Sequence, residues 1–190
     1  GRRRGRGPRR RPRRERRLPP LPSVRECNAA IRSYGDAGDL LAALRLFGRM
    51  RRIRRAEVSP TLVTYSTLMS RAVSLGKPRV ALRLWDIARG SPSFSVDGGE
   101  GLLVPDVRSA NILMNAYAKL GWVPEAADLM AQMRGGGGGD VPPGARPNVV
   151  TYNTYIDACY RAGEVGTGIA ALRTMVEDGI VPDATTYSSL

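Results

Sequence analysis

Apolar residues in the segment 149–183 recur at the spacing of one face of a helix. The first stripe consists of Tyr152, Tyr155, Ile156, Cys159 and Tyr160. A turn at Ala162 and Gly163 interrupts the pattern, and Ile169, Leu172 and Met175 then continue it. Apolar positions three and four residues apart are typical of an amphipathic helix, and a glycine marks a helix end. The segment therefore predicts two helices joined by a tight turn.

The same pattern occurs three more times upstream. The four copies share a glycine after the first helical stretch, at Gly38, Gly76, Gly121 and Gly163. Nine residues after each glycine stands a large apolar residue, namely Phe47, Trp85, Met130 and Leu172. Each copy closes with a proline, at Pro60, Pro105, Pro147 and Pro182. One helical pair cannot cover its apolar face alone, so neighbouring pairs must stack. The sequence predicts an all-α fold, an α-solenoid of helix–turn–helix repeats.

The repeat divides the chain into four full units and the start of a fifth. Their expected bounds are 24–61, 62–106, 107–148, 149–183 and 184–190. The differences in length fall after the second helix of a unit, in the insertions Arg51–Glu57, Gly90–Leu103 and Gly135–Arg146. Their glycine and proline content predicts flexible connectors without added secondary structure.

Positive charge is concentrated at the amino-terminal end. The chain of 190 residues has a net charge of +13, and all but two of its 30 basic residues are arginine. Eleven arginines lie in residues 1–23, where Glu15 is the one acidic residue. This arm has no apolar stripe, so we expect it to be disordered in isolation. It is either an electrostatic arm for RNA phosphates or a solvated tail, including part of a targeting peptide.

Composition also excludes several kinds of chemistry. The sequence has no histidine, which rules out serine–histidine triads and histidine-ligated metal. Cys27 and Cys159 are too far apart for a CxxC pair, and we expect both to be buried. No apolar run reaches the roughly 18 residues that cross a bilayer. We therefore expect no cofactor, no metal, no catalytic residue, no small-molecule substrate and no membrane contact. The acids Asp36, Asp39, Asp86, Glu125, Asp128, Glu164 and Glu177 are expected at turns or on exposed helix faces.

The fourth unit carries a family resemblance. Its stretch Val149–Gly163 and its closing Gly179–Asp183 resemble the pentatricopeptide repeat proteins of organellar RNA metabolism. Its length of 35 residues is similar to the unmodified repeat class of that family. The resemblance covers residues 24–190 and is loosest in the first unit. It implies single-stranded RNA as partner, other RNA-processing proteins as further partners, and a location in the chloroplast or mitochondrion.

The resemblance also implies which side chains contact RNA bases. In the family, one base is bound by a residue near the start of the first helix together with the last residue of the same unit. The pairs carried over are Asn28 with Thr61, Ser66 with Asp106, Asn111 with Asn148, and Asn153 with Asp183, and Ser188 begins a fifth pair. The family's rule then gives 5′-Y-G-Y-U-3′, with Y a pyrimidine. Asn, Ser, Thr and Asp are also favoured at helix caps and turns, so a purely local role is the alternative for each.

A second family position, just after the start of each unit, packs on base faces. Val63 and Val150 have the aliphatic type that the family places there. Arg25 and Arg108 depart from it. A guanidinium plane can stack on a base and neutralise a phosphate, and the alternative is that both arginines are simply exposed.

Together these features favour a sequence-selective RNA-binding protein that acts in organellar RNA processing, stability or translation, and that is not an enzyme. Two alternatives stay open: an α-solenoid scaffold for protein partners, and the repeat region of a larger RNA-processing enzyme such as protein-only RNase P. The chain starts without methionine and stops partway through an expected helix, so we expect it to be part of a longer protein.

Overall fold

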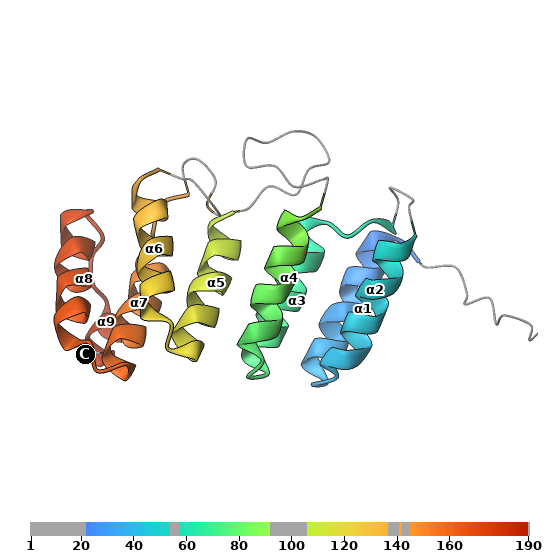
Figure 1. Cartoon of the computed structure of the whole chain (residues 1–190), viewed down its shortest axis with the longest axis horizontal. Helices are drawn as coiled ribbons and strands as arrows, with labels where there is room; N and C mark the ends of the chain where they lie inside the picture. Colours follow the sequence, from blue (N-terminus) through green and yellow to red (C-terminus); the bar gives the residue numbers. More distant parts are fainter. Residues whose placement is uncertain (1–21, 54–57, 92–105, 137–140, 142–144, 190) are drawn as a thin grey trace, which may run out of the picture.

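The computed structural model describes residues 22–53, 58–91, 106–136, 141 and 145–189. In this part of the chain, helices are arranged as four successive pairs followed by one short helix (Figure 1). Their bounds are α1 (Val24–Asp36), α2 (Leu40–Arg52), α3 (Leu62–Ser74), α4 (Pro78–Arg89), α5 (Val107–Leu120), α6 (Val123–Arg134), α7 (Val149–Arg161), α8 (Val165–Glu177) and α9 (Ala184–Ser188). The odd-numbered helices begin at the residues where the sequence places the start of each unit.

A glycine in the left-handed conformation lies in the turn inside each pair. The φ angles of Gly38, Gly76, Gly121 and Gly163 lie between 68° and 79°. This region is costly for residues with a Cβ and accessible to glycine. The chain can therefore end one helix and start the next within three or four residues, as the repeat spacing predicts.

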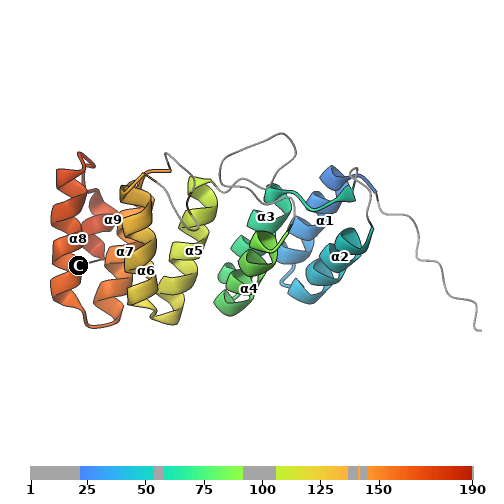
Figure 2. The same ribbon diagram turned by 45° about the horizontal axis from the view of Figure 1, so that its top comes forward.

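The pairs stack into a solenoid with two kinds of helix–helix contact. The odd-numbered helices pack one against the next, α1 on α3, α3 on α5, α5 on α7 and α7 on α9. Helices α2, α4 and α6 each pack on the odd-numbered helix of their own pair and on the odd-numbered helix that follows. Figures 1 and 2 show the pairs following one another along the long axis. The predicted all-α solenoid is confirmed, and none of the described helices is long and apolar enough to span a membrane.

One continuous hydrophobic core runs through all four pairs, from Cys27 to Met175. Of the repeated large apolar positions, Phe47, Trp85 and Met130 are buried, and Leu172 is half-buried on the last full pair. Both cysteines are fully buried as predicted, and burial raises the pKa of each thiol.

The insertions differ from the expected plain connectors in two places. Arg51 and Arg52 belong to α2, because the helix continues past the expected boundary. In the third insertion Val141 is fully buried and Ala145 is 4% exposed, so these apolar side chains are part of the core. The rest of the second insertion, residues 92–103, and most of the arm, residues 1–21, lie outside the described part of the chain.

Candidate nucleic-acid interface

The odd-numbered helices all begin with a capping box, in which the N-cap residue and the third helical residue exchange hydrogen bonds. The N-caps are Ser23, Thr61, Asp106, Asn148 and Asp183. The last four are the second members of the base-contacting pairs implied by the family. The alternative capping role is therefore real for them. Capping engages one oxygen of Asn148 and Asp183, their Oδ1, and leaves a second polar atom on each side chain.

Three of the four pairs are brought together by side-chain hydrogen bonds. Nδ2 of Asn153 donates to Oδ1 of Asp183 at 3.0 Å. Nδ2 of Asn111 donates to Oδ1 of Asn148 at the longer distance of 3.5 Å. In the first pair, Thr64 forms the bridge. Its Oγ1 donates to Oδ1 of Asn28 at 2.7 Å and accepts the backbone N–H of Thr61 at 3.1 Å.

The second pair is different. Ser66 is buried, with 6% exposure, and no hydrogen bond between described residues joins it to Asp106. The hydroxyl of Ser109 lies 2.8 Å from the backbone oxygen of Asp106 and 2.9 Å from its Oδ1. A serine side chain is shorter than an asparagine side chain, so it does not cross the gap between the two helices. Ser188, in the short α9, donates to the backbone oxygen of Ala184 at 2.7 Å.

A groove of about 700 Å³ lies along α3, α5 and α7. Four residues singled out from the sequence line it, namely Arg108, Asn111, Asn148 and Val150. The exposed aliphatic side chains Val63 and Val150 are 56% and 59% exposed, which leaves them free to pack on a ligand. Arg25 and Arg108 are exposed as well.

The groove also contains polar residues that the sequence analysis missed, namely Ser70, Ser74, Asn115, Lys119 and Thr154. Asn115 and Lys119 follow Asn111 at steps of four residues, so they share its helix face. That four-residue spacing is the sequence signal that could have identified Asn115 and Lys119. The charged residues that line the groove, Arg108 and Lys119, are both positive, and a positive groove attracts a polyanion.

The charge state of the fourth pair is well defined. The backbone N–H of Thr186, followed by the side-chain amide of Asn153, holds the pKa of Asp183 below its usual value. The carboxylate is therefore ionised at neutral pH and can only accept hydrogen bonds. Asn153 opposite it supplies donors, so the pair offers both kinds of group within one site.

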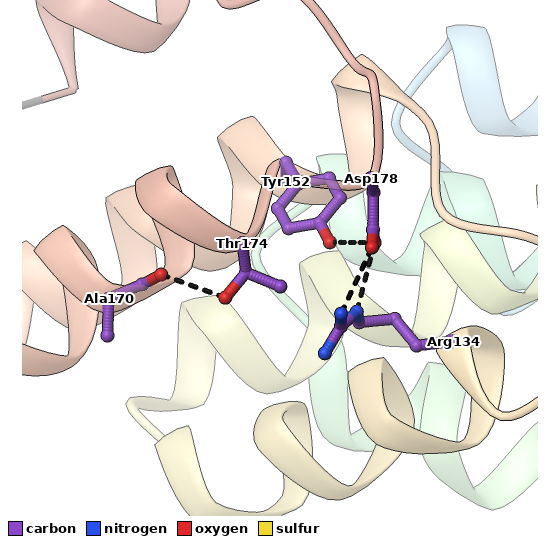
Figure 3. A network of polar contacts seen from close by, with 5 residues as sticks. All are labelled: Arg134, Tyr152, Ala170, Thr174 and Asp178. Atoms are coloured by element: carbon purple, nitrogen blue, oxygen red, sulfur yellow. Dashed lines mark hydrogen bonds and ion pairs between the residues drawn. The ribbon is translucent and has the colours of Figure 1, made fainter. Parts of the chain in front are cut away.

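A polar network on the third and fourth helix pairs fixes their relative position (Figure 3). Nε of Arg134, at the end of α6, donates to Oδ2 of Asp178 at 2.9 Å. The hydroxyl of the buried Tyr152, in α7, donates to the same oxygen. Arg134 first and Tyr152 second hold the pKa of Asp178 below its usual value. Burial and this contact raise the pKa of Tyr152.

The described residues contain no group of three or more Asp, Glu or Cys side chains placed to hold a metal ion. All of the acids expected on exposed positions are exposed. Asp39 caps α2 by accepting the backbone N–H of Ala42.

Three family models match the chain in successive segments. They are described as a pentatricopeptide repeat domain at residues 21–74, a PPR repeat at 63–90 and 108–137, and a PPR repeat family at 147–190. The chain belongs to the pentatricopeptide repeat family. Among curated relatives, a pentatricopeptide repeat-containing protein of Arabidopsis thaliana is 31% identical over 84% of this chain and 15% of its own length. Another from that plant, named chloroplastic, is 27% identical over 82% of the chain and 18% of its length.

Solved structures of pentatricopeptide repeat proteins are similar to this chain. PPR10 in complex with an 18-nucleotide psaJ RNA element has a TM-score of 0.70 and 25% identity, covering 90% of this chain and 22% of PPR10. The repeat domain of Arabidopsis thaliana protein-only RNase P 1, in complex with tRNA, has a TM-score of 0.67 at 17% identity over 88% of this chain and 78% of the domain. This pentatricopeptide repeat chain spans about a fifth or less of the length of its curated relatives.

Proposed function

We propose that this chain binds single-stranded RNA and selects its sequence through the paired side chains at the starts of the odd-numbered helices. The observation that carries the proposal is their recurrence. Asn111 with Asn148 and Asn153 with Asp183 form the same kind of contact one helix pair apart. The first of these pairs lies in the positive groove. A local capping role explains the second member of each pair but not the partner across the gap.

Each unit would bind one nucleotide, with the units bounded at 24–61, 62–106, 107–148 and 149–183. In the fourth, the carboxylate of Asp183 accepts the ring N–H of uracil, while Nδ2 of Asn153 donates to a base carbonyl. Val150 packs on the base face. Arg108 and Lys119 contact phosphates and add affinity without base information. The RNA read by the four units would be 5′-Y-G-Y-U-3′.

The likeness to PPR10, which was crystallised with an RNA element, supports this proposal. We infer that the chain itself binds RNA without catalysing a reaction on it. We also infer an organellar location, the chloroplast or the mitochondrion, since a similar plant protein is named chloroplastic.

A second candidate is a scaffold for protein partners, favoured by one observation. Helix α8 exposes a stripe of apolar side chains, of which Val165, Ile169 and Val176 are 46%, 42% and 58% exposed. Residues spaced by four and seven positions share one helix face, and such a face suits another helix.

Fluorescence anisotropy separates the two candidates. The protein is titrated into labelled RNA that contains 5′-Y-G-Y-U-3′ and into a scrambled RNA, at several salt concentrations. Sequence-selective binding predicts a ratio of affinities that persists as salt rises, because phosphate contacts weaken with salt equally for both RNAs. Equal affinities at every salt concentration would contradict the proposal and favour the scaffold.

A further inference from the structure

Three threonines outside the predicted pairs connect each asparagine to the following helix. Thr64, Thr151 and Thr186 each occupy the third position of an odd-numbered helix and are fully buried. The Oγ1 atom of each donates to Oδ1 of an asparagine 33 to 40 residues away, in the preceding odd-numbered helix. The distances are 2.7 Å to Asn28, 2.6 Å to Asn111 and 2.6 Å to Asn153.

The direction of these hydrogen bonds follows from the single proton on each hydroxyl. Oγ1 of Thr151 accepts the backbone N–H of Asn148 at 3.1 Å, and Oγ1 of Thr186 accepts that of Asp183 at 3.0 Å. A hydroxyl has one proton to donate and can accept two bonds. Oγ1 of Thr151 and of Thr186 also lies 3.0 Å from Oδ1 of Asn148 and of Asp183, respectively. The contact to the asparagine in the preceding helix is shorter, at 2.6 Å in both cases, so we place the proton there and assign the facing asparagine atom as its oxygen.

The other end of the asparagine is fixed independently. Nδ2 of Asn153 faces the carboxylate of Asp183 at 3.0 Å, and a carboxylate offers only acceptors. Nδ2 of Asn111 faces Oδ1 of Asn148, and that oxygen is held in place by the backbone N–H of Thr151 at 3.0 Å. In both cases a flipped amide would place its oxygen against another acceptor oxygen. It would also force the threonine hydroxyl to give up its 2.6 Å contact and donate to Oδ1 of Asn148 or Asp183 at 3.0 Å instead.

We propose that Thr64, Thr151 and Thr186 are positioning residues that fix the amide orientation of Asn28, Asn111 and Asn153, so that each asparagine presents its N–H₂ group, and not its oxygen, to an RNA base. This inference rests on the proposed function. It adds a specificity determinant that lies in the next helix and does not contact RNA, because the threonine is fully buried. An oriented N–H₂ group needs an acceptor at one place on the pairing edge. Both pyrimidines carry the acceptor O2 there, whereas guanine has an N–H₂ donor and adenine a C–H at the corresponding place.

The second pair shows what happens without this arrangement. Ser109 stands where α3, α7 and α9 have threonine, and its hydroxyl is turned to Asp106 of its own cap. Ser66, opposite, has no amide to orient. The positioning device is therefore present at the three asparagines and absent from the one serine among the described pairs.

The test uses Thr151 of α7, which binds Asn111 of the third unit inside the solenoid. Thr151→Val keeps the shape and removes the hydroxyl, and Thr151→Ser keeps the hydroxyl. Binding is measured by anisotropy to four RNAs that differ only at the third base of 5′-Y-G-Y-U-3′. The matched control is Thr174→Val in α8, whose hydroxyl donates to the backbone oxygen of Ala170 at 3.0 Å (Figure 3).

We expect Thr151→Val to reduce the preference for pyrimidines over purines by about 2- to 10-fold, the worth of one hydrogen bond. Thr151→Ser and Thr174→Val should keep the preference of the unaltered protein. If Thr151→Val weakens binding to all four RNAs by one common factor, its role is only to cap the helix and the inference is overturned. If the unaltered protein shows no preference at this base, the proposed function fails, and the inference fails with it.

Circular dichroism decides whether the valine variant folds. Should Thr151→Val unfold, Thr64→Val supplies the same measurement at the first base, because Thr64 binds Asn28 in the same way. An unchanged preference there in a folded variant overturns the inference.

Discussion

The second and fourth of the proposed base-contacting pairs occupy equivalent places in the solenoid and are organised differently. In the fourth, Nδ2 of Asn153 donates to Asp183 at 3.0 Å, and Oδ1 of Asn153 accepts a hydrogen bond from Thr186. In the second, Ser66 is buried and Asp106 is bound by the Ser109 of its own helix. The fourth site joins side chains from α7 and from the start of α9, whereas in the second site Asp106 caps α5 and Ser66 is not bonded to it.

This difference shows that the same backbone framework can hold a site whose two side chains are joined by hydrogen bonds or one whose side chains are not. Capping by the last residue of a unit is common to both. Two side chains distinguish them: the second has Ser66 where the fourth has Asn153, and Ser109 where the fourth has Thr186. The selectivity of the fourth unit should therefore exceed that of the second, although both have an aspartate at the same place.

Removing the arm should have the largest effect and should leave the comparison intact. Deletion of residues 1–20 takes away eleven arginines, and we expect affinity for every RNA to fall on the order of 100-fold at low salt, with a shallower salt dependence. The ratio between matched and scrambled RNA should not change. Anisotropy over a salt series measures both quantities, and a changed ratio would show that the arm contacts bases.

The next effect is expected at Asp183. Asp183→Asn replaces a group that only accepts by one that also donates, so cytosine becomes tolerated at the fourth base. The preference for uracil over cytosine should fall about 5- to 150-fold, since a hydrogen bond from uracil to a charged acceptor is replaced by one that either base can make. Competition binding with the two RNAs measures it.

Two variants serve as references for Asp183→Asn. Asp157→Asn, in the same unit, removes an ion pair with Arg161 at 2.8 Å. Asp157 has no proposed base contact. Asp106→Asn tests the second pair, where we expect a smaller change because no amide from the first helix orients the carboxylate. Equal changes at all three positions would contradict the residue-level assignment while leaving the solenoid intact.

The comparison can also be reversed. Ser66→Asn combined with Ser109→Thr gives the second pair the side chains of the fourth. We expect the second base to change from guanine to uracil, by about tenfold in relative affinity, the worth of one or two hydrogen bonds. Binding to RNAs with each base at that position is the measurement, and the Ser66→Asn variant alone should give a smaller shift.

The smallest expected effect concerns the stability of the contact between the third and fourth helix pairs. Asp178→Asn removes the charge that Arg134 and Tyr152 bind, and we expect a loss of about 1 kcal/mol in unfolding free energy because the network is partly exposed. Since the pKa of Asp178 is lowered in the folded state, its contribution is present at neutral pH and lost as the pH falls below about 4.

Thermal or denaturant unfolding at pH 7 and pH 3 measures this. The unfolding free energy of Asp178→Asn should be lower than that of the unaltered protein at pH 7, and the two values should be closer at pH 3. Asp36→Asn is the control, because its ion pair with Arg71 is also between helix pairs but more exposed; it should change stability by less than about 0.5 kcal/mol.

Most of the fold followed from the sequence, because the repeat multiplies each weak local signal. The glycine turns at Gly38 and Gly163 and the starts of α3 and α7 lie where the spacing placed them. The buried Val141 did not follow from it. A single apolar residue in a glycine-rich segment has no periodicity, and its burial depends on a tertiary contact.

The candidate site was only partly accessible to sequence reasoning. Positions of the paired residues came from the family resemblance, and the structure joins two pairs directly and a third through Thr64. Thr64, Thr151 and Thr186 read in sequence as ordinary capping residues, three positions after each N-cap. Their bonds to asparagines in another unit join residues more than thirty positions apart, which no local pattern reports.

Because each asparagine and its threonine belong to different helix pairs, their hydrogen bond spans the joint between neighbours. The hydrogen bonds that hold each helix together are internal to that helix. A tensile force along the long axis of the solenoid would thus strain the bonds from Thr151 to Asn111 and from Thr186 to Asn153 before it unwinds α5 or α7. If the chain selects bases as proposed, we therefore expect extension of the solenoid to loosen the hold of Thr151 on Asn111 and of Thr186 on Asn153, and so to reduce base selectivity.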